Sequence, residues 1–435
     1  HRDLHRVDRR QRQMCIRDSG TIRANGAGRV GIHDSGGSGG SIYITCARLD
    51  GSSTGLIQAN GEDVSHGGNG GGGGRVAVVY DPLIQAGINP EVRIEARGGT
   101  GGYNSRRQSA PEDGTIYLPD TTFLSSILKN NLFNGRLCIP AFTNWRLDSL
   151  TITGSKVTFS DFNIFVTNTL LISGSNSRLT LSGKSMLSCK NLILTNGGSL
   201  FIWSGATNAL SPKYGSLVKV FKNMNIFSNC WAFARSEYST GGSALWQIKH
   251  LFVAQGGGFD ADMYGYRSGN GPGRGGWNGY DGGGSYGGRG ADTGAGILYG
   301  SEQKPFQPGS GGGPPYGGEG GGFINIEASG NVIINGTLRA NGSGGFATHA
   351  DGGSGGGIFI MCNNLSGNGL LQANGGNGDN SGGAGGGGGR VAIWLVSNSF
   401  SGNVYVNGGT GARGNGQAGT IYWRTFSYGT QILVR

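Results

Sequence analysis

The sequence predicts an all-β protein, an elongated parallel β-helix or solenoid with glycine-rich loops. Three observations support this fold: one stretch of the chain occurs twice, its apolar segments are short and alternating, and 92 of the 435 residues are glycine. That glycine content is about three times the usual share. Internal repeats are typical of an elongated array in which each unit contacts mainly its neighbours. No segment has the periodicity of a convincing amphipathic helix.

The repeat is an ordered series of matching segments. It pairs GTIRAN at 20–25 with GTLRAN at 336–341, GGSGGSIYITC at 36–46 with GGSGGGIFIMC at 352–362, LIQANG at 56–61 with LLQANG at 370–375, GGGGGRVAVVY at 70–80 with GGGGGRVAIWL at 385–395, and GTIYL at 114–118 with GTIYW at 419–423. The order is kept while the separation of the copies drifts, so we expect fixed strands and loops of variable length.

Changes in composition and strand spacing divide the chain into six segments. In the first, residues 1–19, MCIRDS at 14–19 resembles one frame of the transposase end sequence used in preparing DNA sequencing libraries, so we exclude it from the fold as adapter-derived. The others are a first glycine-rich copy at 20–120, tighter coils at 121–255, a glycine- and aromatic-rich segment at 256–335, a second copy at 336–424, and the start of a further, truncated unit at 425–435.

Short β-branched and aromatic stretches mark the strands of the first copy. They fall at residues 21–24, 41–46, 56–59, 75–80, 92–96 and 115–118. Alternation places Ile42, Ile44 and Cys46 on one face of a strand. Gly, Asn and Ser fill the gaps between strands, a cadence that predicts coils stacked in parallel about 4.8 Å apart.

Strands come more often in the middle of the chain, separated by short turns. We predict them at residues 150–153, 156–159, 163–166, 169–172, 178–181, 191–194, 199–203, 217–220 and 244–254. Turns such as Gly154-Ser155 separate tighter coils with a conventional aliphatic core. Asn at turn positions is expected to stack in ladders between coils.

Residues 256–322 are the most glycine-dense part of the chain. Ordering glycine costs backbone entropy, so this segment forms either polyproline II-like chains packed side by side or a mobile loop. Its aromatic residues favour order: Tyr264, Tyr266, Trp277, Tyr280, Tyr286, Tyr299 and Tyr316. Flat rings stack on sugar faces, so these seven are also the candidate glycan contacts.

A resemblance rests on the series GYRSGNGPGRGG at 265–276, GGGSYGGRGA at 282–291 and PGSGGG at 308–313, followed by the second copy. It is similar to the glycine-rich repeats of large, mostly uncharacterised surface proteins of bacteria and protists, and to plant glycine-rich proteins. The likeness covers nearly all of residues 20–423. It implies an extended β-rich protein, extracellular or at the cell surface, and supplies no catalytic residues.

Local motifs give little chemistry. GxGxxG within 265–276 lacks the strand-to-helix context of a nucleotide site. The five cysteines beyond residue 19 are widely spaced without CxxC, which disfavours a disulfide framework or zinc. Cofactors are not expected, although loop oxygens at 375–383 leave calcium as a weak alternative.

The two copies also share three polar or small positions. His33 and His349 match, with Asp34 and Asp351 nearby, and are expected at polar coil corners; Cys46 and Cys362 match and are expected in the core. Arg75 and Arg390 each follow five glycines. We expect them to cap backbone carbonyls, the alternative being contacts with anionic sugars.

The net charge and the positions of the acidic residues limit the possible functions. The net charge is +10, or +7 beyond residue 19, without a basic run, which disfavours nucleic acid as a partner. No membrane span is visible. The acids from residue 260 onward are scattered in loops: Asp260, Asp262, Asp281, Asp292, Glu302, Glu319 and Glu327. We therefore expect a non-enzymatic structural or adhesive scaffold that contacts surface polysaccharides or other surface proteins. The alternative is a carbohydrate-active β-helix enzyme or its accessory module.

Overall fold

The computed structural model describes residues 20–28, 35–64, 68–101, 112–130, 132–207, 214–276 and 282–427. The predicted adapter segment 1–19 and most of 425–435 lie outside these ranges. The chain forms two compact units. The first comprises His1–Ser105, Ala110–Phe142 and Gly154–Val157, and the second comprises Arg106–Ser109, Thr143–Thr153 and Thr158–Arg435.

Nearly all regular structure in the described residues is β, as predicted, and the strands pair in parallel. The exception is one short helix, α1 (Pro82–Gln85), in the first unit. Asp81 caps it by accepting a hydrogen bond from the Leu83 amide at 2.9 Å.

The strands of the first unit form two parallel rows. One row runs β1 (Thr21–Arg23), β3 (Leu56–Gln58), β5 (Arg93–Glu95) and β8 (Phe133–Cys138). The other runs β2 (Ser41–Thr45), β4 (Arg75–Val79) and β6 (Thr115–Tyr117), and also reaches β8. A two-residue strand, β7 (Ile127–Leu128), follows β6 in the chain. All six strands predicted for the first copy are confirmed, to within one residue at each end.

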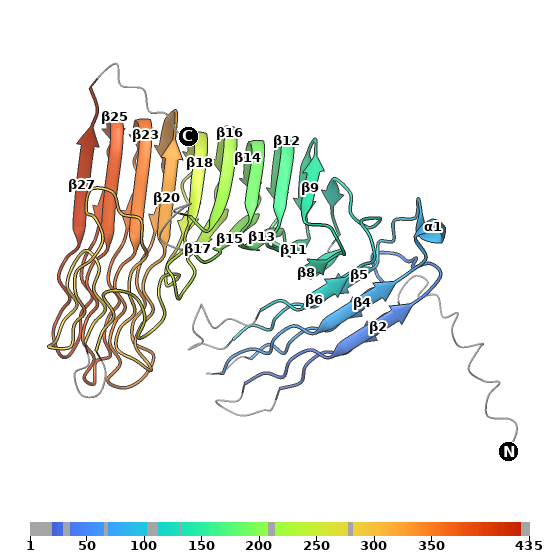
Figure 1. Ribbon diagram of the computed structural model, residues 1–435, viewed down its shortest axis with the longest axis horizontal. Helices are drawn as coiled ribbons and strands as arrows, with labels where there is room; N and C mark the ends of the chain where they lie inside the picture. The colour runs from blue at the N-terminus through green and yellow to red at the C-terminus, as the bar shows by residue number, and fades with distance from the viewer. Residues whose placement is uncertain are drawn as a thin grey trace, which may run out of the picture. The chain divides into compact units, whose positions relative to one another are not determined.

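Long strands make up one parallel sheet of the second unit (Figure 1). Its strands, here called the long-strand sheet, are β9 (Asn144–Leu147), β10 (Leu150–Thr153), β12 (Asn163–Ser173), β14 (Met186–Thr195), β16 (Ser216–Ile226), β18 (Ala244–Val253), β20 (Phe323–Ala328), β21 (Asn331–Ile334), β23 (Gly357–Gly367), β25 (Arg390–Phe400) and β27 (Thr420–Thr425).

A second parallel sheet of this unit consists of shorter strands. This short-strand sheet runs β13 (Arg178–Gly183), β15 (Ser199–Ser204), β17 (Trp231–Arg235), β19 (Gly258–Asp260), β22 (Thr337–Arg339), β24 (Leu370–Gln372) and β26 (Asn403–Tyr405). The division between the units falls within β11 (Lys156–Ser160). Alternate residues such as Leu200, Ile202 and Ile360 are buried, so apolar alternation forms the core.

The pairing of the long strands shifts register part-way along their length. The shift lies between Val166 and Thr169 in β12, and adjoining shifts follow in β14 and β16. The two strands predicted at 163–166 and 169–172 are therefore one strand with a bulge. We call this column of extra residues the bulge corner; in β14, β16 and β18 it holds Lys190, Phe221, Lys222 and Lys249.

The glycine-rich segment leaves the array after β19 and returns at β20, so the predicted segment 256–335 includes strands at both ends. Its described residues lie beside the glycine runs of the second copy, below β20, β23 and β25 in Figure 1. The alternative of a mobile loop gives way to order, because lateral backbone hydrogen bonds join these chains.

The hydrogen bonds of residues 385–389 repeat every three residues. The backbone amides of Gly385 and Gly388, three residues apart, donate to carbonyls in residues 414–417. Those of Gly386 and Gly389 donate to carbonyls in residues 373–376. The amide of Gly387, between them, donates to the Gly284 carbonyl, and all five distances lie between 2.7 and 3.0 Å. Three residues is the period of a polyproline II helix, whereas a strand alternates with two. A Cβ at Gly387 would overlap the Gly288 carbonyl oxygen, so only glycine permits this approach.

Candidate functional site

The seven aromatic residues predicted as glycan contacts do not form one exposed surface. Three are buried: Tyr264, Tyr266 and Tyr286. Tyr299 is half-buried with its hydroxyl group enclosed, and Tyr316 is 57% exposed. Trp277 and Tyr280 lie outside the described residues. A buried ring face cannot stack on a sugar, so among the described members only Tyr316 remains open to a ligand.

Two of these rings pack beside an arginine. The ring centroids of Tyr286 and Tyr299 are 4.7 Å apart, and the Arg390 guanidinium carbon lies 5.3 Å from the Tyr286 centroid. Ser310 Oγ donates to Tyr299 Oη at 2.9 Å, and Tyr299 Oη donates to the Pro308 carbonyl at 2.5 Å. Burial raises the pKa of both tyrosine hydroxyls, which therefore stay protonated at alkaline pH values that ionise an exposed tyrosine. The cluster orders the segment.

Arg390 caps backbone carbonyls, as predicted. Its Nη2 donates to the carbonyls of Tyr299 and Tyr286 at 2.9 and 3.2 Å, and its Nη1 donates to Thr420 Oγ1 at 3.1 Å. Arg75 is exposed and makes no such bond within the described ranges. The capping prediction is thus confirmed for the second copy alone.

The loop at 375–383, where calcium was the weak alternative, is held by Asp379. Its Oδ2 accepts hydrogen bonds from the amides of Ser381 at 2.9 Å and His349 at 3.1 Å. These bonds, first that from Ser381, lower the pKa of Asp379. His33 and Asp34 lie outside the described residues. Across the part of the chain that the structure describes, no three His, Cys, Asp or Glu side chains gather as metal ligands do.

Cysteine placement follows the sequence in one copy. Cys362 is buried in the core, and burial raises the pKa of its thiol to about 12. Cys46 is only half-buried and follows the last residue of β2. All five described cysteines are free thiols.

Two acids that the sequence places among scattered loop residues lie together at the end of β19, beside Arg339 of β22. Arg339 Nη2 is 2.8 Å from Asp260 Oδ2, and Arg339 Nε is 3.1 Å from Asp262 Oδ2. The Arg339 guanidinium also lies over Trp231, 4.6 Å from the ring centroid. Asp262 further accepts the Asn341 amide at 2.6 Å. Both carboxylates are paired with the arginine and with backbone amides, an arrangement that links β19 to β22.

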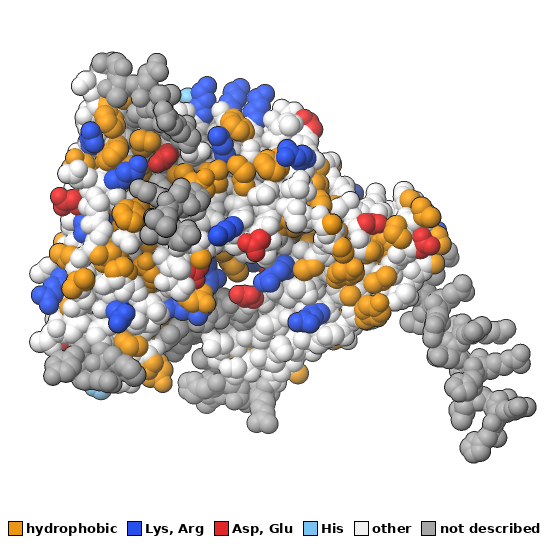
Figure 2. Space-filling model, viewed as in Figure 1, with side chains coloured by type: hydrophobic (Ala, Val, Ile, Leu, Met, Phe, Trp, Pro, Cys, Tyr) orange, Lys and Arg blue, Asp and Glu red, His pale blue; other side chains and the backbone are white. Residues whose placement is uncertain are grey.

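Parallel pairing brings together three lysines that stand far apart in the sequence. Lys190, Lys222 and Lys249 occupy the bulge corner in the adjacent strands β14, β16 and β18. All three are exposed, and neighbouring strands lie about 4.8 Å apart. Figure 2 shows blue side chains in a row along the upper edge, over these strands. We call these three residues the lysine row. Their unequal spacing in the sequence gives them no constant period, so the sequence alone does not indicate that they lie together.

The surroundings of the lysine row suit an anion. β14, β16 and β18 contain no Asp or Glu, and none of the three lysines bonds to another residue in the described part of the chain. Phe221, 55% exposed, precedes Lys222 at the corner. Aligned like charges repel one another, so anionic groups placed along the row would be stabilised.

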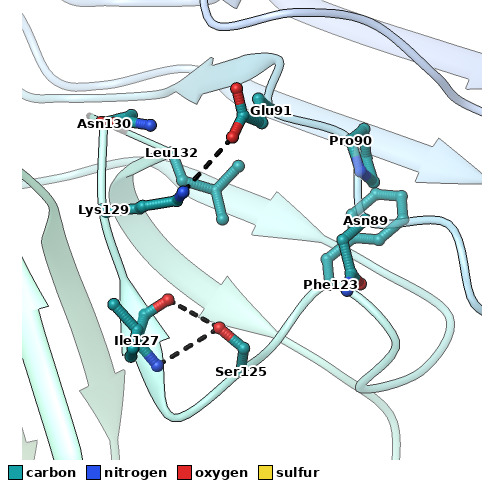
Figure 3. Close-up of a pocket in the computed structure, with 9 residues that line it drawn as sticks. All are labelled: Asn89, Pro90, Glu91, Phe123, Ser125, Ile127, Lys129, Asn130 and Leu132. Carbon is teal, nitrogen blue, oxygen red and sulfur yellow. Dashed lines mark hydrogen bonds and ion pairs between the residues drawn. The ribbon is translucent and has the colours of Figure 1, made fainter.

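A small pocket in the first unit offers less chemistry (Figure 3). Its volume is about 240 Å³, at the low end for small-molecule sites. Glu91, its one acid, lies 3.5 Å from Lys129 Nζ, and Ser125 Oγ donates to the Ile127 carbonyl at 2.6 Å. The acid and the serine are thus each paired, and no nucleophile with an adjacent base lines the pocket.

The chain matches no family model and no curated protein. Among the described residues, no helix is long and apolar enough to cross a membrane.

Proposed function

We propose that this chain is part of a non-enzymatic β-solenoid scaffold, extracellular or at the cell surface, of the kind that its glycine-rich repeats resemble. The observation that carries the proposal is a ladder of asparagines. Asn341 Oδ1 accepts a hydrogen bond from the backbone amide of Asn374, and Asn374 Oδ1 accepts one from the backbone amide of Asn407, each at 2.8 Å. Equivalent side chains thus bond from one coil to the next, as stacked coils require.

The glycine runs extend the scaffold sideways as polyproline II-like chains. Their support is the three-residue hydrogen-bond period of residues 385–389 together with the close backbone approach that glycine allows. Such a sheaf has few apolar side chains, so lateral hydrogen bonds supply its cohesion.

The scaffold's ligand, in this proposal, is an acidic polysaccharide held along the lysine row. Uronate or sulfated sugars carry an anionic group and an apolar ring face in each repeat, which suits aligned lysines beside the exposed ring of Phe221. Double-stranded DNA is a poorer fit, because the row presents three charges on a corner and no groove.

Binding of the full chain to polygalacturonate and heparin, with dextran as a neutral control, tests this function. The variant K190Q/K222Q/K249Q should lose affinity by about threefold to 150-fold, since three exposed ion pairs at about 0.2–1 kcal/mol each are removed. R48Q/K129Q/R413Q removes three other exposed cations and should retain binding. Equal loss in both variants, or preference for DNA or anionic vesicles, would refute the polysaccharide assignment.

A carbohydrate-active enzyme is the second candidate because Asp260 and Asp262 both lie against one arginine, Arg339. Chain cleavage in the same incubations decides between the two. Product formation that Asp262→Asn abolishes would establish the enzyme and overturn the scaffold.

A further inference from the structure

The two sequence copies have the same strands in different surroundings. In the second copy, Phe359 of β23 is fully buried and Arg390 of β25 is 6% exposed. Their equivalents in the first copy are Tyr43 of β2, which is 73% exposed, and Arg75 of β4, which is also exposed. The same sheet face is therefore covered in one copy and open in the other.

Strand register shows that the two faces are built alike. In the second copy, Phe359 pairs with Ala392 and Ala392 with Tyr422. The first copy pairs Tyr43 with Ala77, and Ala77 with Tyr117, in strands β2, β4 and β6. The difference in burial thus comes from what lies over the face.

Residues 282–310 cover the second copy through backbone groups. The Gly387 amide donates to the Gly284 carbonyl at 2.9 Å, and the Gly288 amide donates to the Gly388 carbonyl at 2.8 Å. Farther along the face, Trp394 Nε1 donates to the Gln303 carbonyl at 2.9 Å. The Arg390 bonds to Tyr286 and Tyr299 described above complete the contact.

The first copy holds the matching donors without such a cover. Gly72, equivalent to Gly387, has open space where a Cβ would stand, and its amide has no acceptor among the described residues. Arg75 and Tyr43 flank it on β4 and β2. The Gly72 amide, the Arg75 guanidinium and the Tyr43 ring thus occupy the positions whose counterparts in the second copy contact residues 282–310.

We propose that the face of β2, β4 and β6, with the adjoining glycine run 70–74, docks a glycine-rich, tyrosine-bearing chain segment of the 282–310 type. Arg75 donates to carbonyls of that segment, Gly72 donates one backbone hydrogen bond, and Tyr43 packs beneath it. Only glycine fits at the closest approach, because a Cβ at Gly283 would overlap the Gly385 carbonyl in the covered copy.

The test adds a synthetic peptide of residues 282–310 to the full chain, and in a second arm fuses the same peptide through a flexible linker ahead of residue 20. The tether raises the effective concentration to the millimolar range, which offsets the ordering entropy of a glycine-rich peptide. Hydrogen exchange followed by mass spectrometry should show protection of residues 70–80 and no change at 385–395.

Variants separate this docking from nonspecific association. Arg75→Gln should weaken binding about tenfold or more, since hydrogen bonds from a charged group are the strong ones, whereas Arg23→Gln on β1 should not. A peptide with alanine at positions 283, 284 and 287 should not bind. Absence of protection in the tethered arm, or equal binding of the alanine peptide, would overturn the proposal. Neither outcome bears on polysaccharide binding at the lysine row, because those lysines lie in the second unit.

Discussion

The guanidinium of Arg390 donates two hydrogen bonds to the backbone carbonyl of Tyr299, from Nε at 3.2 Å and from Nη2 at 2.9 Å. Arg390 is the first residue of β25, and Tyr299 lies in the glycine-rich segment. A buried guanidinium needs several acceptors, and these carbonyls provide them while the segment gains an anchor.

Replacement of Arg390 should therefore loosen the glycine-rich segment. Arg390→Gln is expected to destabilise the second unit by about 2–4 kcal/mol, because buried carbonyls lose a charged donor. Arg75→Gln, at the equivalent but exposed position, should change stability by no more than about 0.5 kcal/mol. Urea unfolding of both variants measures this, and equal shifts of the midpoint would contradict a role specific to the covered copy.

Glycine substitutions offer a second matched pair. A side chain at Gly387 would overlap the Gly288 carbonyl oxygen, whereas a Cβ at Gly72 meets nothing within 4 Å. Gly387→Val should lower the thermal midpoint by more than a substitution at an exposed surface residue does. Gly355→Val should act similarly, because a side chain at Gly355 would overlap the Ala373 carbonyl oxygen. Gly72→Val should be tolerated. A tolerated Gly387→Val in a scanning calorimetry series would disprove the close packing of these runs.

The asparagine ladder predicts a local effect. Asn374→Ala removes the acceptor of the Asn407 amide and should cost about 1 kcal/mol. Asn374→Asp keeps an acceptor oxygen at that position and serves as the control. Hydrogen exchange at Asn407 should quicken in the alanine variant alone; unchanged protection there would show that the ladder contributes nothing.

Alkaline pH should weaken the glycine-rich segment. Burial raises the pKa of Tyr266 from 10.0 to about 12, so folding disfavours the ionised phenol. The stability contributed by this group is complete below pH 10 and is lost as the pH rises towards 12. Tyr266→Phe should therefore reduce the loss of stability between pH 10 and 12, whereas Tyr316→Phe, at an exposed ring, should leave it unchanged. Urea midpoints measured across that range make the comparison, and a Tyr266→Phe profile as steep as the parent's would contradict it.

Strand positions in the first copy could be predicted because alternation and glycine punctuation are local properties. The pattern at residues 41–46 specifies β2 without any knowledge of its partner. Prediction was weaker at β12, which was split in two because its bulge adds exposed residues that look like a turn. It also missed β17, whose sequence WAFAR has alanine at the buried positions and aromatic rings on the other face, so apolar and polar residues do not alternate.

The candidate sites depended on contacts between residues far apart in the sequence. Composition suggested exposed aromatic residues, yet Tyr264 and Tyr286 are buried, and Tyr286 packs against Tyr299 and Arg390. The lysine row could not be predicted because segments of unequal length separate Lys190, Lys222 and Lys249 in the sequence, and only strand pairing aligns them.

The sequence by itself determined the all-β character, the order of the strands in the first copy and the need for glycine where chains approach closely, since each follows from side-chain size and local alternation. Tertiary structure alone decided which of two identical motifs is buried. Arg75 and Arg390 share the same neighbours in sequence, but only Arg390 meets residues 286 and 299, because the glycine-rich segment folds back over the second copy. Solvent exposure, and with it function, depends on contacts between residues far apart in the chain.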